Sequence, residues 1–179
     1  TSQFVGNKTK GFFPAVSAGW NIAEEPFIKK NFKFIDLLKL RGSWGITGSD
    51  ITGGNTYKTE QVYIVGPNYN FGETTNTFPS LQEGTLGNLD ITWEKSKKTD
   101  IGLDATLFGN FTITADWYHK KTSGMLLQID VPGYVGNSGP IGNIADLSNR
   151  GFELELGYNK KVGEFSFRVA ANGSFLTNN

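Results

Sequence analysis

The stretch NRGFELELGYNKKVGEFSFRV, residues 149–169, contains two runs in which apolar side chains alternate with polar residues or glycine. In the first run Phe152 and Leu154 share one parity, while Glu153 and Glu155 share the other. Successive side chains of a strand point to opposite faces, so this period of two predicts a β-strand with one apolar face and one charged face. The short lysine- and glycine-containing turn between the runs predicts a hairpin.

The same period recurs along the chain and predicts strands at residues 12–22, 37–47, 93–108, 111–121, 151–159 and 165–176. One parity is apolar and includes Leu40, Ile113 and Leu154. The opposite parity carries charges of both signs, namely Lys39, Arg41, Asp100, Asp104, Asp116, Glu153, Glu155 and Arg168. These runs are rich in Gly, Thr and aromatic residues, which favour strands over helices. We therefore expect an all-β, antiparallel fold.

The composition excludes several classes of function. Lys and Arg number 17, as do Asp and Glu, so the chain has no net charge and lacks the basic surface that nucleic-acid binding requires. Without Cys and with one His, it has little to offer a zinc site or a thiol nucleophile. No apolar run is long enough for a membrane-spanning helix, although the strands of a membrane barrel alternate and need no such run.

Two architectures accept such strands. In a soluble β-sandwich the apolar face is the core, whereas in an outer-membrane barrel it contacts lipid and the polar face lines the lumen. The connections favour the barrel, because the tight turns at 108–110 and 160–164 fall at one end of the strands. The long loops, 48–92 and 122–150, fall at the other end. Short turns on one rim and long loops on the other are typical of such barrels.

Aromatic rings on the apolar face agree with a membrane. Trp44, Trp93, Trp117 and Tyr158 lie toward strand ends, where rings with one polar atom settle at a lipid–water boundary. Beyond Trp93, two lysines, Lys95 and Lys97, continue the outward parity, which fits the headgroup level rather than the bilayer centre.

The link 23–37 lies on the short-turn rim but is long for a turn. Glu24 and Glu25 followed by Pro26 are typical of a helix start, because acidic side chains and proline suit the first turn. We expect a small surface helix in this link.

The charged parity offers no catalytic set. Glu153 and Glu155 lie on neighbouring rungs, but glycoside hydrolysis needs two carboxyl groups placed across a bound sugar, one of them with a raised pKa. We expect these and the other inward charges to pair across strands, or with groups outside this chain. No catalytic, cofactor-binding or metal-binding residue is predicted, and the substrate-binding residues are unknown.

The expected loops contain aromatic rings among Asn, Thr and Gly, namely Tyr57, Tyr63, Tyr69, Phe71, Phe78 and Tyr134. Such rings with short amides can stack on sugars and bind their hydroxyls. The same composition suits a self-packed loop or a contact surface for a partner protein. The sequence leaves these three interpretations open.

Other features receive structural interpretations. Glycines recur at every third position, at Gly133, Gly136, Gly139 and Gly142, and predict a mobile loop rather than a collagen helix. His119 has the outward parity at the end of an expected strand, so an interfacial position is favoured over a metal role. The triplets beginning at Asn7, Asn110 and Asn172 match glycosylation acceptors, but Asn110 and Asn172 lie in or beside expected strands, so the triplets are discounted.

Four blocks of the chain resemble one protein family in their order. They are GFFPAVSAGWNIAEEPFI (11–28), LLKLRGSWGITGSD (37–50), WEKSKKTDIGLDATLFGNFTITADWYHKKTSGMLL (93–127) and IGNIADLSNRGFELELGYN (141–159). This succession is similar to the barrel region of SusC/RagA-type TonB-dependent outer-membrane transporters.

The resemblance implies an up-and-down transmembrane barrel of about 22 strands, of which these six are an interior segment. It implies import of oligosaccharides or peptides across the bacterial outer membrane, driven through TonB and assisted by a SusD-like surface lipoprotein. No plug domain or TonB-contacting segment is found in the chain, so we expect TonB to act through a missing N-terminal region.

Three alternatives remain at this point. The first is a soluble β-sandwich that acts as a carbohydrate-binding module. The others are a different outer-membrane barrel, either a siderophore receptor or a porin. An enzyme is disfavoured, because no residue set combines a nucleophile, a base and an orienting group.

Overall fold

The structure is a computed structural model, and it describes residues 2, 4–50, 59–70, 72 and 77–179. The chain divides into two compact units. One is formed by residues 1–12, 48–95 and 123–146, and the other by residues 13–47, 96–122 and 147–179. Within the described residues, no helix is both long enough and apolar enough to cross a bilayer.

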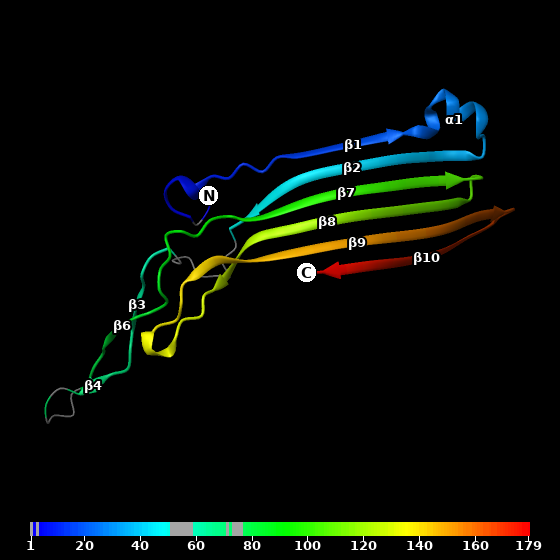
Figure 1. Ribbon diagram of the computed structural model, residues 1–179. Helices are drawn as coiled ribbons and strands as arrows, with labels where there is room; N and C mark the ends of the chain where they lie inside the picture. The colour runs from blue at the N-terminus through cyan, green and yellow to red at the C-terminus, as the bar shows by residue number, and fades with distance from the viewer. Residues whose placement is uncertain (1, 3, 51–58, 71, 73–76) are drawn as a thin grey trace. The chain divides into compact units, whose positions relative to one another are not determined.

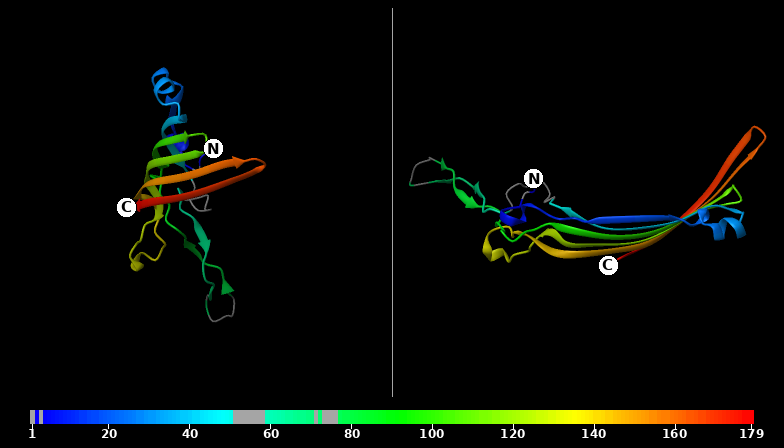
Figure 2. Two further views of the ribbon diagram at one scale, coloured as in Figure 1. Left: turned by 90° about the vertical axis from the view of Figure 1, so that its right-hand side faces the viewer. Right: turned by 90° about the horizontal axis from the view of Figure 1, so that it is seen from above.

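The main element is an antiparallel sheet in the order β1-β2-β7-β8-β9-β10 (Figure 1). Its strands are β1 (Ala15–Asn21), β2 (Ile35–Ser49), β7 (Glu94–Leu107), β8 (Phe111–Gln128), β9 (Ile141–Val162) and β10 (Phe165–Asn178). Each strand pairs with the next long strand along the chain, as in an up-and-down barrel, and the strands lie side by side in one layer (Figure 2). The predicted six-stranded antiparallel fold is confirmed.

Two strands, β8 and β9, extend well beyond the ranges that the alternation predicted. β8 continues to Gln128 and β9 begins at Ile141, so the expected loop 122–150 is wrong at both ends and the connection is residues 129–140. In the extended part of β8, Gly124 has a positive φ of 68°, which departs from regular strand geometry. The amide of Asn143 in β9 donates to the Gly124 carbonyl at 2.7 Å and ties the two strands together.

The first strand begins later than expected. The strand predicted at 12–22 is β1, and it begins only at Ala15. Pro14 precedes it and has no N–H to donate to a ladder, but its carbonyl accepts the Ile46 N–H at 2.9 Å. The strand therefore starts where backbone donors become available.

The predicted surface helix is confirmed as α1 (Pro26–Asn31), which follows a 3-10 turn at Ile22–Glu24. Its two preceding carboxylates are held locally: Trp20 Nε1 donates to Glu25 at 2.9 Å, and Lys29 pairs with Glu24 at 2.9 Å. At the turn between β7 and β8, Phe108 stacks on Phe34 with ring centroids 5.2 Å apart. Aromatic contacts therefore join the connections at this end of the strands.

The described part of the expected loop 48–92 contains short strands of its own. β3 (Tyr63–Val65) pairs with β6 (Leu81–Glu83), and β4 (Tyr69–Asn70) pairs with β5 (Thr77–Phe78). In the same compact unit, Trp93 Nε1 donates to the Lys8 carbonyl at 2.8 Å, and the Trp93 ring meets Phe4 edge-on. Trp93 thus packs against the N-terminal segment rather than lying on a free apolar face as expected.

The two faces of the sheet differ in how they are covered. On the outward face, Leu40, Ile101 and Phe152 are 40 %, 50 % and 46 % exposed, although all three are large and apolar. Ala105 is the buried apolar residue of the described strands. The apolar side chains of this sheet do not form an enclosed core, which is the opposite of a soluble sandwich.

Candidate functional site: the charged face of the sheet

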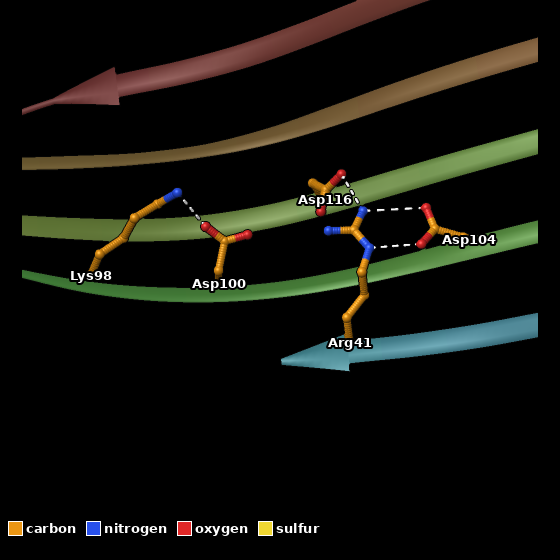
Figure 3. A network of polar contacts seen from close by, with 5 residues as sticks. All are labelled: Arg41, Lys98, Asp100, Asp104 and Asp116. Carbon is orange, nitrogen blue, oxygen red and sulfur yellow. Dashed lines mark hydrogen bonds and ion pairs between the residues drawn. The ribbon is translucent and has the colours of Figure 1, made fainter. Parts of the chain in front are cut away.

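An ion network lies on the inward face, across β2, β7 and β8 (Figure 3). Arg41 of β2 donates from Nε to Asp104 Oδ2 at 2.7 Å and from Nη2 to Asp104 Oδ1 at 3.3 Å. The same Nη2 donates to Asp116 Oδ2 of β8 at 2.9 Å. One guanidinium thus joins three neighbouring strands, and charge-assisted bonds of this kind are stronger than neutral ones.

A glycine makes this geometry possible. Gly102 of β7 lies under the guanidinium, and a Cβ at that position would be 2.6 Å from Arg41 Cζ and 2.8 Å from Nη1. Any larger residue would push the guanidinium away from the sheet. Gly102 therefore provides the flat path along which Arg41 reaches from β2 to β8.

A second ion pair extends the network. Lys98 Nζ lies 2.5 Å from Asp100 Oδ2, on the same face of β7, and 5.7 Å from the centre of the Tyr118 ring. Tyr118 in turn lies over Gly151, where a Cβ would be 2.7 Å from the phenol oxygen. Arg41 and Tyr118 each extend along the sheet over a glycine of the next strand, Gly102 and Gly151 respectively. Charged and aromatic side chains therefore lie parallel to this face of the sheet.

These groups border a shallow hollow of about 730 Å³. Its lining residues are Arg41, Lys98, Asp100, Asp116, Tyr118, Lys120, Leu147, Asn149, Glu153, Leu176 and Asn178. The lining carries both charges, and one oxygen, Asp116 Oδ1, is buried and accepts no hydrogen bond from the part of the chain that the structure describes. Such a surface can hold polar or charged groups by hydrogen bonds, but it presents no activated nucleophile.

The predicted pairing of inward charges is confirmed for several residues. Arg41 pairs with Asp104 and Asp116, and Arg168 of β10 pairs with Glu155 of β9 at 3.3 Å. The two glutamates of the quoted stretch are separated in role, because Glu155 meets Arg168 while Glu153 lines the hollow. The structure thus places neither of them in a paired-carboxylate arrangement across a cavity.

Sequence reasoning overlooked part of this site. Lys98 and Lys120 line the hollow and Gly102 lies beneath the guanidinium, yet none of them was a candidate. Their parity was the available signal, since each has the same parity in its strand as an aspartate of the network. Parity does not predict which inward side chains contact each other across neighbouring strands.

The loop aromatics are exposed where the structure describes them. Tyr63, Tyr69, Phe78 and Tyr134 are 62 %, 48 %, 46 % and 90 % exposed. Tyr69 and Phe78 face each other across the β4–β5 pair, with ring centroids 6.3 Å apart. Tyr57 and Phe71 lie outside the described residues. These rings are available for contact with a ligand or a partner.

The remaining singled-out residues lie in regular structure or turns. His119 lies within β8 rather than at its end, and its Nε2 is 3.1 Å from Ser148 Oγ. Gly142 belongs to β9, so the glycine series is not one continuous loop, and Gly133 opens the 3-10 helix Gly133–Val135. Within the described ranges, no group of three or more His, Asp or Glu residues could hold a metal ion.

The three sequence triplets fall in different settings. Asn7 lies in a 3-10 helix at Gly6–Thr9, and Asn110 lies in the turn after β7, where its side chain donates to the Phe108 carbonyl at 2.8 Å. Asn172 lies within β10, opposite Glu155 of β9.

Comparison with known proteins gives a consistent result. The family model for the β-barrel of TonB-dependent receptor-like proteins matches residues 1–179. TonB-dependent receptor P39 of Formosa agariphila is 34 % identical over 180 residues, covering 99 % of this chain and 16 % of the relative. TonB-dependent receptor SusC of Bacteroides thetaiotaomicron is 32 % identical over 158 residues, covering 87 % of this chain and 16 % of SusC.

A solved structure shares the fold. The RagAB peptide importer in its closed-closed state superposes with a TM-score of 0.82 at 24 % identity, covering 99 % of this chain and 19 % of that chain. This chain therefore spans about a sixth of the length of the curated relatives it matches. With the paired strands, the exposed apolar face and a family model that matches throughout, the chain belongs to the TonB-dependent receptor-like β-barrel family.

Proposed function

We propose that this chain forms part of the wall of a TonB-dependent nutrient importer in the bacterial outer membrane. The observation that carries the proposal is the division of the sheet into two faces. Large apolar side chains such as Ile101 and Phe152 stay about half exposed on one face. On the other face Arg41 binds two aspartates from neighbouring strands. Lipid on the first face and a polar lumen behind the second account for this division.

The edges of the sheet support the same proposal. β1 and β10 are its edge strands, and each has one neighbour in the sheet. In a bilayer every unpaired backbone N–H or C=O costs several kcal/mol, so a sheet in lipid has to close on itself. The proposal is that further strands outside these residues complete a barrel of about 22 strands, with a plug domain inside it.

The names of the relatives support the proposed partners and cargo. One relative is named SusC, and the solved structure with the same fold is described as a peptide importer. We therefore extend to this protein the import of oligosaccharides or peptides together with a SusD-like surface lipoprotein. The exposed aromatics Tyr63, Tyr69 and Phe78 are suited to contact that lipoprotein or the cargo. TonB would act through a region outside this chain.

The chemistry expected of these residues is passive. The inward side chains offer hydrogen-bond donors and acceptors of both charges, and those in the ion network are paired with each other. Transport then depends on the barrel lumen, the plug and the loops rather than on bond-making by the wall.

Uptake by cells tests the proposal and separates it from other barrels. The gene for the full-length protein is deleted, and uptake of labelled oligosaccharides and labelled peptides is compared with the parent strain. We expect the mutant to lose uptake of one cargo class, and an uncoupler of the proton gradient to cause the same loss in the parent. Uptake that resists the uncoupler would indicate a porin, and loss confined to ferric chelates would indicate a siderophore receptor.

Fractionation tests the membrane location separately. The full-length protein is expected in the outer-membrane fraction, with an electrophoretic mobility that changes on heating as the barrel unfolds. Recovery as a water-soluble monomer that unfolds cooperatively without detergent would contradict the proposal. It would favour the alternative of a soluble β-sandwich.

A further inference from the structure

Two charged side chains that border the inward hollow stay unpaired. Lys120 of β8 and Glu153 of β9 both line the hollow, and both are exposed. Within the part of the chain that the structure describes, neither side chain forms an ion pair or a hydrogen bond. The other charges of the lining are paired, because Arg41 holds two aspartates and Lys98 holds Asp100 (Figure 3). The hollow therefore presents an available cation and an available carboxylate.

The available cation belongs to a row of hydrogen-bond donors. Tyr118 of β8 lies over Gly151 of β9, and this contact sets the antiparallel register of the two strands. Two residues further along each strand, the register places Lys120 opposite Asn149, and Asn149 is paired with Asn178 of β10. These three side chains all line the hollow. An ammonium beside two amides that can donate is suited to a carboxylate group.

The available carboxylate belongs to a row of acceptors. Thr112 lies over Gly157 in the same register, which places Asp116 opposite Glu153. Asp116 Oδ1 is buried and accepts no hydrogen bond from the described residues. Like charges directly opposite each other destabilise a strand pair, so a cation bound at Glu153 would relieve this repulsion. The second row is therefore suited to an ammonium group.

The two rows are separated along the strands. Asn149 and Glu153 are four residues apart on β9, which corresponds to about 13 Å at a rise of about 3.3 Å per residue. The hollow includes both rows, and its volume of about 730 Å³ lies within the range of sites for small ligands. A ligand that satisfies both rows therefore needs a carboxylate and an ammonium about 13 Å apart.

We infer that the hollow binds a short peptide with free ends, whose C-terminal carboxylate contacts Lys120 and whose N-terminal ammonium contacts Glu153. The inference rests on the proposed function, because it takes the inward face to line the lumen of an importer, and it names peptides as the cargo class. An extended peptide spans about 3.3–3.6 Å per residue, so about four residues reach from one row to the other.

The charges of the two rows disfavour the other cargo class. A neutral oligosaccharide brings no charge to Lys120 or to Glu153. An acidic oligosaccharide would be attracted to Lys120, but Glu153 and Asp116 would repel it. A peptide with free ends is attracted at both rows, so charge complementarity selects it over either sugar.

Tetraalanine with free and blocked ends tests the inference on the parent protein. The full-length protein, purified in neutral detergent, is titrated in a calorimeter with tetraalanine, with its N-acetylated, amidated and doubly blocked forms, and with maltotetraose. Exposed ion pairs contribute up to about fivefold in affinity, so blocking one end should weaken binding by about fivefold and blocking both ends by about 25-fold. Maltotetraose should bind more weakly than tetraalanine.

Two variants assign the ends of the peptide. Lys120→Gln should weaken the binding of tetraalanine by about fivefold but leave that of tetraalanine amide unchanged, because the amide has no carboxylate. Glu153→Gln should weaken tetraalanine by the same factor and leave the N-acetylated peptide unchanged. The matched controls, Lys39→Gln and Glu155→Gln, change inward charges outside the lining of the hollow and should alter affinity by less than about twofold.

Three results would each overturn the inference. The first is equal binding of free and doubly blocked tetraalanine, which a plug that covers the hollow would produce. The second is an equal loss of affinity in Lys120→Gln and Lys39→Gln. The third is tighter binding of maltotetraose than of tetraalanine.

Uptake by cells separates this inference from the proposed function. If deletion of the gene changes neither peptide uptake nor oligosaccharide uptake, the proposed function fails and the peptide site fails with it. If deletion removes oligosaccharide uptake alone, the proposed function stands and the peptide site fails. Heat-dependent mobility shows whether each variant folds. If Lys120→Gln does not fold, the series of blocked peptides on the parent protein decides the outcome.

Discussion

Glu153 and Leu154 are consecutive residues of β9, yet they belong to two differently organised surfaces. Glu153 borders the polar hollow of the inward face, which Asp116 and Lys98 also line. Leu154 lies on the outward face, whose large apolar side chains have no covering layer among the described residues. The inward face pairs several of its charges within the sheet, as Arg41 does with Asp104 and Asp116. The large apolar side chains of the outward face stay exposed in the sheet, so their burial depends on the surroundings.

The difference between the two faces predicts which substitutions the sheet tolerates. A charge added inward enters an environment that already holds both signs, close to water. A charge added outward, under the proposed function, enters hydrocarbon and finds no partner. The same change made one residue apart should therefore have unequal effects.

The largest effect is expected for Leu154→Arg. An arginine on the lipid face near the middle of the bilayer costs about 2–4 kcal/mol of barrel stability. The matched control is Glu153→Arg on the inward face, which should cost less than about 1 kcal/mol, because lumen positions tolerate charge. The measurement is denaturant unfolding of the full-length barrel reconstituted in liposomes. Equal costs for the two variants would mean that the outward face does not contact lipid.

The next largest effect is expected for Arg41→Gln, on the inward face. The change removes the cation shared by Asp104 and Asp116, whose side chains are 28 % and 22 % exposed, so two partly shielded carboxylates lose their partner. Hydrogen bonds to charged groups contribute about 1.5–3 kcal/mol, and partial exposure reduces this, so we expect a loss of about 2 kcal/mol.

A double substitution checks the cause of that loss. Adding Asp116→Asn to Arg41→Gln removes one of the two carboxylates that lost their cation. The double variant should therefore recover part of the lost stability, as measured by denaturant unfolding. If the losses of the two single variants simply add, the residues do not interact in the folded barrel.

A smaller effect is expected for Gly102→Ala. The new methyl group would lie within 3 Å of the Arg41 guanidinium and force it away from one of its carboxylates. Overpacking of this kind costs about 1–3 kcal/mol, and the flexible end of Arg41 can yield, so the lower limit of about 1 kcal/mol is expected. Gly173→Ala in β10 is the matched control, because a Cβ there meets nothing within 4 Å. The measurement is the thermal unfolding of both variants. An equal change in melting temperature for Gly102→Ala and Gly173→Ala would contradict the close approach of Arg41 to Gly102.

The alternation of residues was sufficient to predict much of this organisation. It assigned Leu40 and Leu154 to one face and Arg41, Asp104 and Asp116 to the other, and it predicted that the inward charges pair. The alternation was informative because the two faces of the sheet have different surroundings, so apolar and polar residues alternate along each strand. The match to the family and the shared fold agree with that prediction.

Parity was insufficient where side chains replace the regular ladder. Asn143 donates to the carbonyls of Thr92 and Gly124, and its Oδ1 accepts the Thr92 N–H at 2.9 Å. The side-chain amide of Asn143 thus forms the hydrogen bonds that a neighbouring strand would form. The spacing of apolar residues does not predict such contacts. The extension of β8 and β9 and the short β3–β6 pairing were missed for this kind of reason: they depend on contacts distant in sequence.

The smallest effect is expected for Arg168→Gln, and it separates the two kinds of ion pair on the inward face. Arg168 contacts Glu155 at 3.3 Å, but the two side chains are 62 % and 48 % exposed, so water screens the pair. Exposed pairs of this kind contribute about 0.2–1 kcal/mol, and we expect the lower end of that range. The readout is denaturant unfolding at low and high salt. The small contribution of Arg168 should vanish at high salt, whereas that of Arg41 should persist, because salt screens exposed charges more than shielded ones. If both contributions fall equally with salt, the Arg41 network is no more shielded than an ordinary surface pair, and the contrast between them is lost.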